Sequence, residues 1–234
     1  MDDITITYSF SFQNRPEFHF ALNFAADTME YRLPVQTGPE WTSLGFQQCL
    51  NCPLPININN QHCPAALSLI PILKSFAGVT SHDELEVTVS ATGRKTYAKT
   101  TAQRAIGSMM GLVLATSGCP NLAFLRPMAR FHLPLADEDE TIFRAVSMYL
   151  MAQYFRRKKG FVVDMELEGL GKLYEHLQVV NRALAERLRT AARTDSSINA
   201  VIILDMYAKT IPFVIMEELN EIEGLFSQYW IENK

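Results

Sequence analysis

The sequence predicts an α+β fold, in which an antiparallel sheet from the first half of the chain packs against helices of the second half. Apolar residues alternate with a period of two through residues 4–24, as in half-buried strands. Two more such runs lie within residues 84–100 and are separated by a short turn, which is typical of a hairpin. Beyond residue 120 the apolar residues recur at helical spacing instead.

The expected sheet has about five strands, formed by an N-terminal meander and the later hairpin. The first two strands are predicted at residues 4–10 and 18–24, and a third, at residues 29–33, would complete the meander. The hairpin strands are predicted at residues 84–90 and 95–100.

Two helices are expected around this sheet. Residues 35–58 are rich in proline, glycine and asparagine and predict a loop. A helix at residues 64–76 follows, and Pro71 should kink it or end its first part. Another helix, at residues 102–116, should end where Gly118 can adopt the left-handed conformation.

The second half predicts four amphipathic helices. Acidic residues 137–140 and basic residues 156–159 flank the first of them in the order that complements the helix dipole. We therefore interpret the basic run as a helix end. The helices are expected at residues 140–157, 166–192, 197–207 and 213–230.

A chain of 234 residues can bury one large core, and we expect residues 1–234 to form a single α+β domain. The one candidate boundary, near residue 120, would divide a β-rich, cysteine-bearing part (1–120) from a helical part (121–234).

Composition and charge exclude several classes of protein. A net charge of -4 disfavours a nucleic-acid-binding module. The N-terminus lacks the basic and apolar regions of a secretory signal, and the longest apolar stretch, residues 109–115, is too short to cross a bilayer. We expect a cytoplasmic protein with no nucleic-acid or membrane partner. An unidentified protein partner and a homo-oligomer are both compatible with the sequence.

The chain has four cysteines, Cys49, Cys52, Cys63 and Cys119, and three of them directly precede a proline. Proline suits the first position of a helix, so Cys63 and Cys119 are expected at helix N-caps. Backbone N–H groups and the helix dipole favour thiolates there. A loop follows Cys52, and no helix is predicted after it.

In a reducing compartment this pattern favours metal binding or redox chemistry over structural disulfides. The C-x2-C pair and Cys63 lie close in sequence, whereas Cys119 must join them by tertiary contact. Four thiolates suit either zinc or an iron–sulfur cluster. The apolar surroundings and Pro53 favour the cluster, for electron transfer or sensing, while zinc would give structural support.

Four further residues are candidates to support the ligands. His62 adjoins Cys63 and is interpreted chiefly as a structural hydrogen-bonding residue. His132 follows Arg126 and Arg130, which could pair with a reduced cluster or an anionic ligand, or equally with the acidic residues 137–140.

Two alternatives remain open. Cys49 and Cys52 alone would suffice for thiol–disulfide exchange, although the usual strand and helix around such a motif are missing. In a metal-free interaction protein, the helical half would bind a partner while the cysteines cap helices and pack. The sequence contains no H-E-x-x-H, G-x-S-x-G or phosphate-loop motif, so whether the protein is an enzyme stays undecided.

The cysteine motifs also carry a resemblance, together with a run containing His132. They read N-C-P-L at 51–54, H-C-P-A at 62–65, S-G-C-P at 117–120 and P-M-A-R-F-H-L-P at 127–134, with further likeness at 148–154, 179–182 and 203–205. The chain thereby resembles an uncharacterised family of bacterial proteins, a domain of unknown function, over most of its length. The resemblance implies a standalone bacterial protein and assigns no activity or functional residue.

Overall fold

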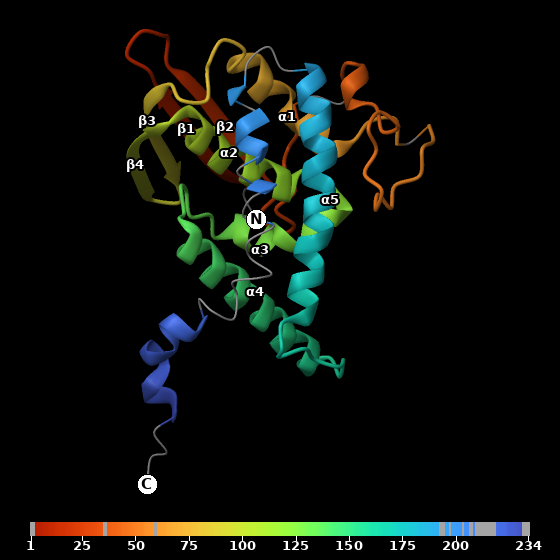
Figure 1. Ribbon diagram of the computed structural model, residues 1–234, viewed down its shortest axis with the longest axis vertical. Coiled ribbons are helices and arrows are strands. Elements are labelled where there is room, and N and C mark those ends of the chain that lie inside the picture. The colour runs from red at the N-terminus through yellow and green to blue at the C-terminus, as the bar shows by residue number, and fades with distance from the viewer. Residues whose placement is uncertain are drawn as a thin grey trace.

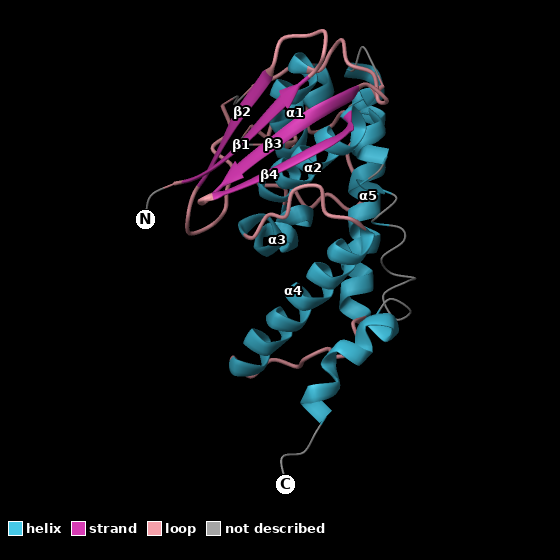
Figure 2. Ribbon diagram, turned by 90° about the vertical axis from the view of Figure 1, so that its left-hand side faces the viewer, coloured by secondary structure: helices cyan, strands magenta, loops and turns pink. Residues whose placement is uncertain are grey.

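The fold is α+β, as the sequence predicts. The computed structural model describes residues 3–34, 37–58, 60–191, 195–196, 198–202, 204–205, 208 and 219–230. An antiparallel sheet of four strands, in the order β2-β1-β3-β4, has helices packed behind one face (Figures 1 and 2). In both views α4 extends away from the sheet, and α5 runs between these two regions.

The two central strands supply the sheet's buried face. Side chains of β1 and β3 alternate between the core and the outer surface, and Tyr8, Phe10 and Val87 are fully buried. The β3–β4 turn has positive φ at Thr92 (41°) and Gly93 (77°), as expected of a tight hairpin turn. The strands are β1 (Ile4–Ser11), β2 (Phe18–Phe24), β3 (Glu84–Ala91) and β4 (Arg94–Thr101).

The predicted third strand at residues 29–33 is wrong, and the sheet has four strands where about five were expected. Met29 has a φ of 57°, and its N–H donates to the Ala25 carbonyl at 2.8 Å. The Tyr31 N–H donates to the Thr116 carbonyl at 2.9 Å, so the segment bonds the end of a helix. Only an isolated bridge between Phe24 and Tyr31 remains of the expected pairing.

Two helices lie against the sheet. Helix α1 (Pro64–Ser75) continues through Pro71 and does not end there. Helix α2 (Ala102–Thr116) follows β4 without a loop and is largely buried. Gly118, with a φ of 88°, confirms the predicted left-handed end of this helix.

An aromatic cluster fixes the end of α1 to the sheet. The ring of Phe76 lies 5.0 Å from that of Phe10, 5.2 Å from that of Phe18 and 5.6 Å from that of Phe20, measured between ring centroids. Aromatic pairs at these distances stabilise a core beyond the burial of their area.

The two long helices, α4 and α5, correspond to those predicted at residues 140–157 and 166–192, whereas the 3₁₀ helix at Glu40–Thr42 lies in the segment predicted as a loop. The charges at both ends of α4 lie as predicted, with acidic residues in its first turn and basic residues in its last. The expected helices at 197–207 and 213–230 fall partly outside the described residues. The elements are the short 3₁₀ helices η1 (Glu40–Thr42), η2 (Pro120–Leu125) and η3 (Glu223–Trp230), and the helices α3 (Arg126–Arg130), α4 (Glu138–Lys158) and α5 (Glu168–Ala191).

No single helix of the described chain combines the length and the apolar composition needed to cross a membrane. Helix α2 and residues 120–130 reach that threshold only when taken together, across a bend of 113°.

Asp137 caps α4 through a capping box with Glu140. Its carboxylate accepts the Glu140 N–H at 2.9 Å, and the Glu140 carboxylate accepts the Asp137 N–H at 3.0 Å. We expect Asp137→Ala to lower the free energy of unfolding by about 1 kcal/mol in urea denaturation, because it leaves helix N–H groups unpaired. Asp139→Ala is the matched control, since it removes an exposed first-turn carboxylate that caps nothing. An equal loss in both variants would contradict the capping role.

Candidate cysteine site

The C-x2-C turn is tied to the segment that follows Cys119. The Cys52 N–H donates to the Cys49 carbonyl at 3.0 Å and closes the turn. The Asn121 side chain donates to the backbone carbonyl of Asn51 at 3.1 Å and to its side-chain oxygen at 3.2 Å. Asn51 in turn donates to a carbonyl of α5, that of His176, at 3.1 Å. Three segments distant in sequence therefore meet at this turn.

Cys63 and Cys119 occupy the N-caps of α1 and η2, which confirms the prediction from the two Cys-Pro pairs. Their backbone conformations are almost the same, with φ and ψ of -72° and 119° at Cys63 and of -67° and 123° at Cys119. Both side chains are buried. The two caps also adjoin, because a Cβ built on Gly118 would lie only 3.9 Å from the Pro64 Cβ.

The four thiols lie near one another, as the pKa values of Cys49, Cys63 and Cys119 indicate. Burial, followed by the neighbouring thiols, raises the pKa of Cys49 to about 12. Burial likewise raises the pKa of Cys119 to about 11 and also raises the pKa of Cys63. Across these groups, every pair among Cys49, Cys52, Cys63 and Cys119 interacts. The sequence analysis required this convergence.

Backbone N–H groups at both helix starts oppose the effect of burial. Those of Ala66 and Ala65 lower the pKa of Cys63, and those of Asn121 and Leu122 lower the pKa of Cys119. None of these contacts has full hydrogen-bond geometry. The helix starts thus present donors to the sulfurs, as the Cys-Pro pattern predicts.

Arg187 of α5 brings a positive charge to this site from the molecular interior. Its side chain is only 1% exposed. The guanidinium donates to the carbonyls of Trp41 at 2.7 Å, Ser43 at 2.8 Å and Leu44 at 3.1 Å, while its Nε has no partner among the described residues. These bonds join α5 to the loop that leads to the C-x2-C turn.

The charge of Arg187 lowers the pKa of Cys49 and of Cys63, against the larger effect of burial. No carboxylate of the described chain forms an ion pair with it. A buried cation without an anionic partner is costly. Arg187 was not predicted as part of the site, although an arginine three positions after Leu184, on the apolar stripe of a helix, indicates a buried charge.

His62 lies beside the site in a structural role. Its Nδ1 bonds the Thr42 hydroxyl at 2.9 Å, and the Thr42 carbonyl accepts the Cys63 N–H at 2.8 Å. These bonds hold the chain just before the buried Cys63. This arrangement matches the hydrogen-bonding interpretation made from the sequence.

The other three candidates have partners elsewhere. Arg126 forms an ion pair with Glu30 at 3.4 Å, and the exposed Arg130 lies over the ring of its neighbour Phe131. The Nε2 of His132 bonds the Tyr8 hydroxyl at 2.5 Å. A role for any of them in supporting a metal stays a prediction.

All four cysteines are free thiols in this structure. Within the described ranges, no three or more histidine, cysteine, aspartate or glutamate side chains are grouped tightly enough to hold one metal ion. The thiols therefore share one region without closing around a single point.

Comparison with known proteins identifies a family to which no activity is assigned. The model of a family described as a domain of unknown function, DUF6901, matches residues 6–227. No curated protein and no solved structure matches the chain.

In reduced, metal-free protein, the free energy of unfolding should fall as the pH rises from 8 to about 9.5. Thiols of the unfolded chain titrate near pH 8.5, whereas those of Cys49 and Cys119 in the folded chain hold their protons to about 12 and 11. Their stabilising contribution is complete below about pH 8.5 and is lost as the pH climbs towards the folded values.

Urea denaturation of wild type and Cys49→Ala measures this effect. The variant should show a shallower fall, by at most about 1.4 kcal/mol per pH unit. Asp139→Ala, which retains every thiol, should keep the wild-type slope. Parallel slopes for wild type and Cys49→Ala would show that the thiol of Cys49 is not shifted by folding.

Proposed function

The chain belongs to the DUF6901 family, whose function is unknown, and from its own residues we propose that Cys49, Cys52, Cys63 and Cys119 bind an iron–sulfur cluster. The cluster serves electron transfer or redox sensing. The observation that carries this proposal is the meeting of all four thiols of the chain beside a buried arginine.

The spacing of the thiols favours a cluster over a single ion. Four thiolates on one zinc ion converge tightly on a tetrahedron. In an iron–sulfur cluster, several iron and sulfide atoms lie between the thiolates, which consequently stand farther apart. Thiols that interact in every pair, yet do not group around one point, suit the second arrangement.

Electrostatics favours an anionic centre at this place. Burial alone keeps Cys49, Cys63 and Cys119 as neutral thiols near pH 7, because it raises their pKa values. An iron–sulfur cluster, assembled from iron and sulfide, would be held by these cysteines as thiolates and would carry a net negative charge. Arg187 would then have the partner that the described residues do not supply, and the N–H groups at the starts of α1 and η2 would face the sulfurs.

The exposure of the site suits electron exchange. Cys63 and Cys119 are buried, whereas Cys49 and Cys52 are partly exposed, so one side of the cluster would lie near solvent. Leu50, between the two outer cysteines, is fully exposed and offers an apolar contact to a redox partner.

Iron and acid-labile sulfide, measured together with the visible spectrum of anaerobically purified protein, test the proposal directly. Wild type should contain both and be coloured, and Cys63→Ala and Cys119→Ala should each lose most of the iron. Ser117→Ala, which removes a nearby hydroxyl but no thiol, should retain it. Stoichiometric zinc without sulfide would contradict the cluster and indicate a structural zinc site instead. Folded protein that contains no metal would contradict both the cluster and the zinc site.

Arg187 should tune the reduction potential of the cluster. Because reduction adds negative charge, Arg187→Met should lower the midpoint by about 60 mV if the arginine is worth a tenfold change in a one-electron equilibrium. Arg187→Lys should recover most of the shift, since it keeps the charge. Arg189→Met is the matched control, as Arg189 lies on the same helix but pairs with Glu186 at the surface. Redox titration followed by visible absorption measures the midpoints, and equal values for Arg187→Met and wild type would remove Arg187 from this role.

A further inference from the structure

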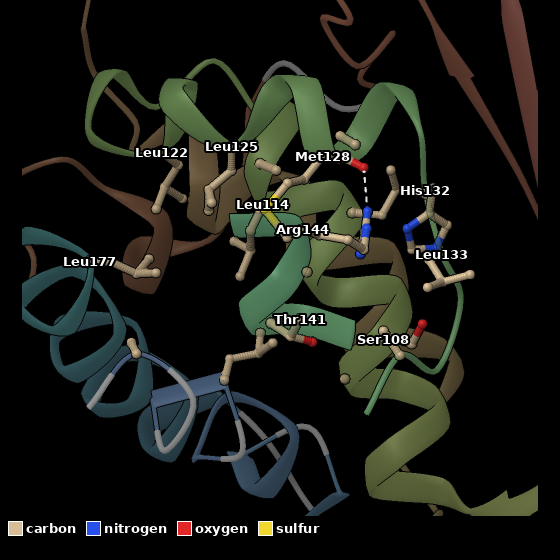
Figure 3. Close-up of a pocket in the computed structure, with 18 of the residues that line it drawn as sticks. Ser108, Leu114, Leu122, Leu125, Met128, His132, Leu133, Thr141, Arg144 and Leu177 are labelled. Carbon is tan, nitrogen blue, oxygen red and sulfur yellow. Dashed lines mark hydrogen bonds between the residues drawn. The ribbon is translucent and has the colours of Figure 1, made fainter. Parts of the chain in front are cut away.

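A cavity of about 190 Å³ lies among α2, the segment from η2 to Ala136, α4 and α5 (Figure 3). None of the four cysteines lines it, so it is distinct from the proposed cluster site. Most of its lining is apolar, with a few polar side chains among the described residues. This composition is typical of a pocket for a small ligand.

The two sides of the cavity differ in character. Leu122, Leu125 and Leu177 lie on one side in Figure 3. Ser108, His132 and Leu133 lie on the other, and the guanidinium of Arg144 lies near His132 on that side. An elongated ligand would therefore meet leucines with one end and a positive charge with the other.

Arg144 carries a charge that no described carboxylate pairs with directly. Its Nη2 donates to the carbonyls of Met128 at 2.8 Å and Phe131 at 3.1 Å, and no described residue accepts from its Nε or Nη1. Glu140 acts on Arg144 only at a distance, because its carboxylate belongs to the capping box of α4. Partial burial lowers the pKa of Arg144, which means that its charge lacks full solvation.

Two more donors line the same cavity from α5. Asn181 is 2% exposed, and its Nδ2 has no hydrogen-bond partner in the described part of the chain. Tyr174 is buried next to Arg144, and its burial raises the pKa of the phenol, so it remains a neutral donor. Buried donors of this kind are normally satisfied, and a ligand oxygen would satisfy them.

The other ionisable groups of the lining indicate how many negative charges the ligand carries. Burial lowers the pKa of His132 to about 3, so that ring is neutral near pH 7. Arg104 also contributes to the lining but is exposed to solvent. One partly desolvated cation suits one carboxylate better than a dianionic phosphate.

We propose that this cavity binds a monocarboxylate with an aliphatic chain of medium length. The carboxylate pairs with Arg144 and accepts from Tyr174, and the chain packs against Leu122, Leu125 and Leu177. The binding depends on no cysteine and so does not require the cluster.

Calorimetric titration of the full-length protein with octanoate tests this proposal. Octanoate should bind, while octan-1-ol, which has the chain without the charge, and acetate, which has the charge without the chain, should bind at least tenfold more weakly. Arg144→Gln should lower the affinity for octanoate at least tenfold. Arg130→Gln, an exposed arginine outside the cavity lining, should leave it unchanged.

A second variant separates loss of binding from loss of folding, because Arg144 also holds the carbonyls of Met128 and Phe131. Leu125→Trp fills the apolar side and leaves those bonds in place, so it should abolish binding while circular dichroism and thermal unfolding stay close to wild type. Folded wild type that does not bind octanoate, or unchanged binding in both variants, would overturn the proposal. Equal affinity for octan-1-ol would overturn the assignment of a carboxylate.

Discussion

A guanidinium buried without a described carboxylate partner is the constraint on which the arrangement of this protein depends. Arg187 donates hydrogen bonds to the carbonyls of Trp41, Ser43 and Leu44. These bonds fix α5 against the loop that carries the first cysteines. A further hydrogen bond, from the Asn51 side chain to the carbonyl of His176, holds the same loop to α5 nearer the start of the helix. The long helix therefore braces a loop that has little regular structure of its own, and the charge that braces it favours an anion nearby.

Helix α2 connects the sheet to both proposed sites. It begins where β4 ends, so the sheet sets its direction. Near its middle, Ser108 bonds the Tyr8 hydroxyl of β1 at 3.0 Å and accepts the Leu135 N–H at 3.0 Å, beside the cavity. At its end, the left-handed Gly118 turns the chain into Cys119. The same buried helix, α2, therefore positions both the cavity and the cysteine site. The two sites are distinct, because no cysteine lines the cavity.

Much of the fold could be predicted because it follows from local patterns. Alternation located the four strands that formed, and apolar spacing with glycine at the end placed α2 at its observed bounds. The strand expected at residues 29–33 failed because the Tyr31 N–H bonds the Thr116 carbonyl, a competitor far along the chain. The same distinction applies to the site. Proline after cysteine marks the N-caps at Cys63 and Cys119, but Arg187 acts through carbonyls more than 140 positions away, and the cavity forms between separate segments.

The spread of the cysteine site along the chain bears on the order in which the protein can be completed. The ribosome synthesises a chain from its N-terminus. A part of a domain that needs later residues can therefore fold only after those residues have been made. Cys49, Cys52 and Cys63 emerge early, Cys119 follows 56 residues after Cys63, and the charge of Arg187 arrives only with the last turns of α5. The cysteine site can therefore be completed only after residue 187 has been synthesised.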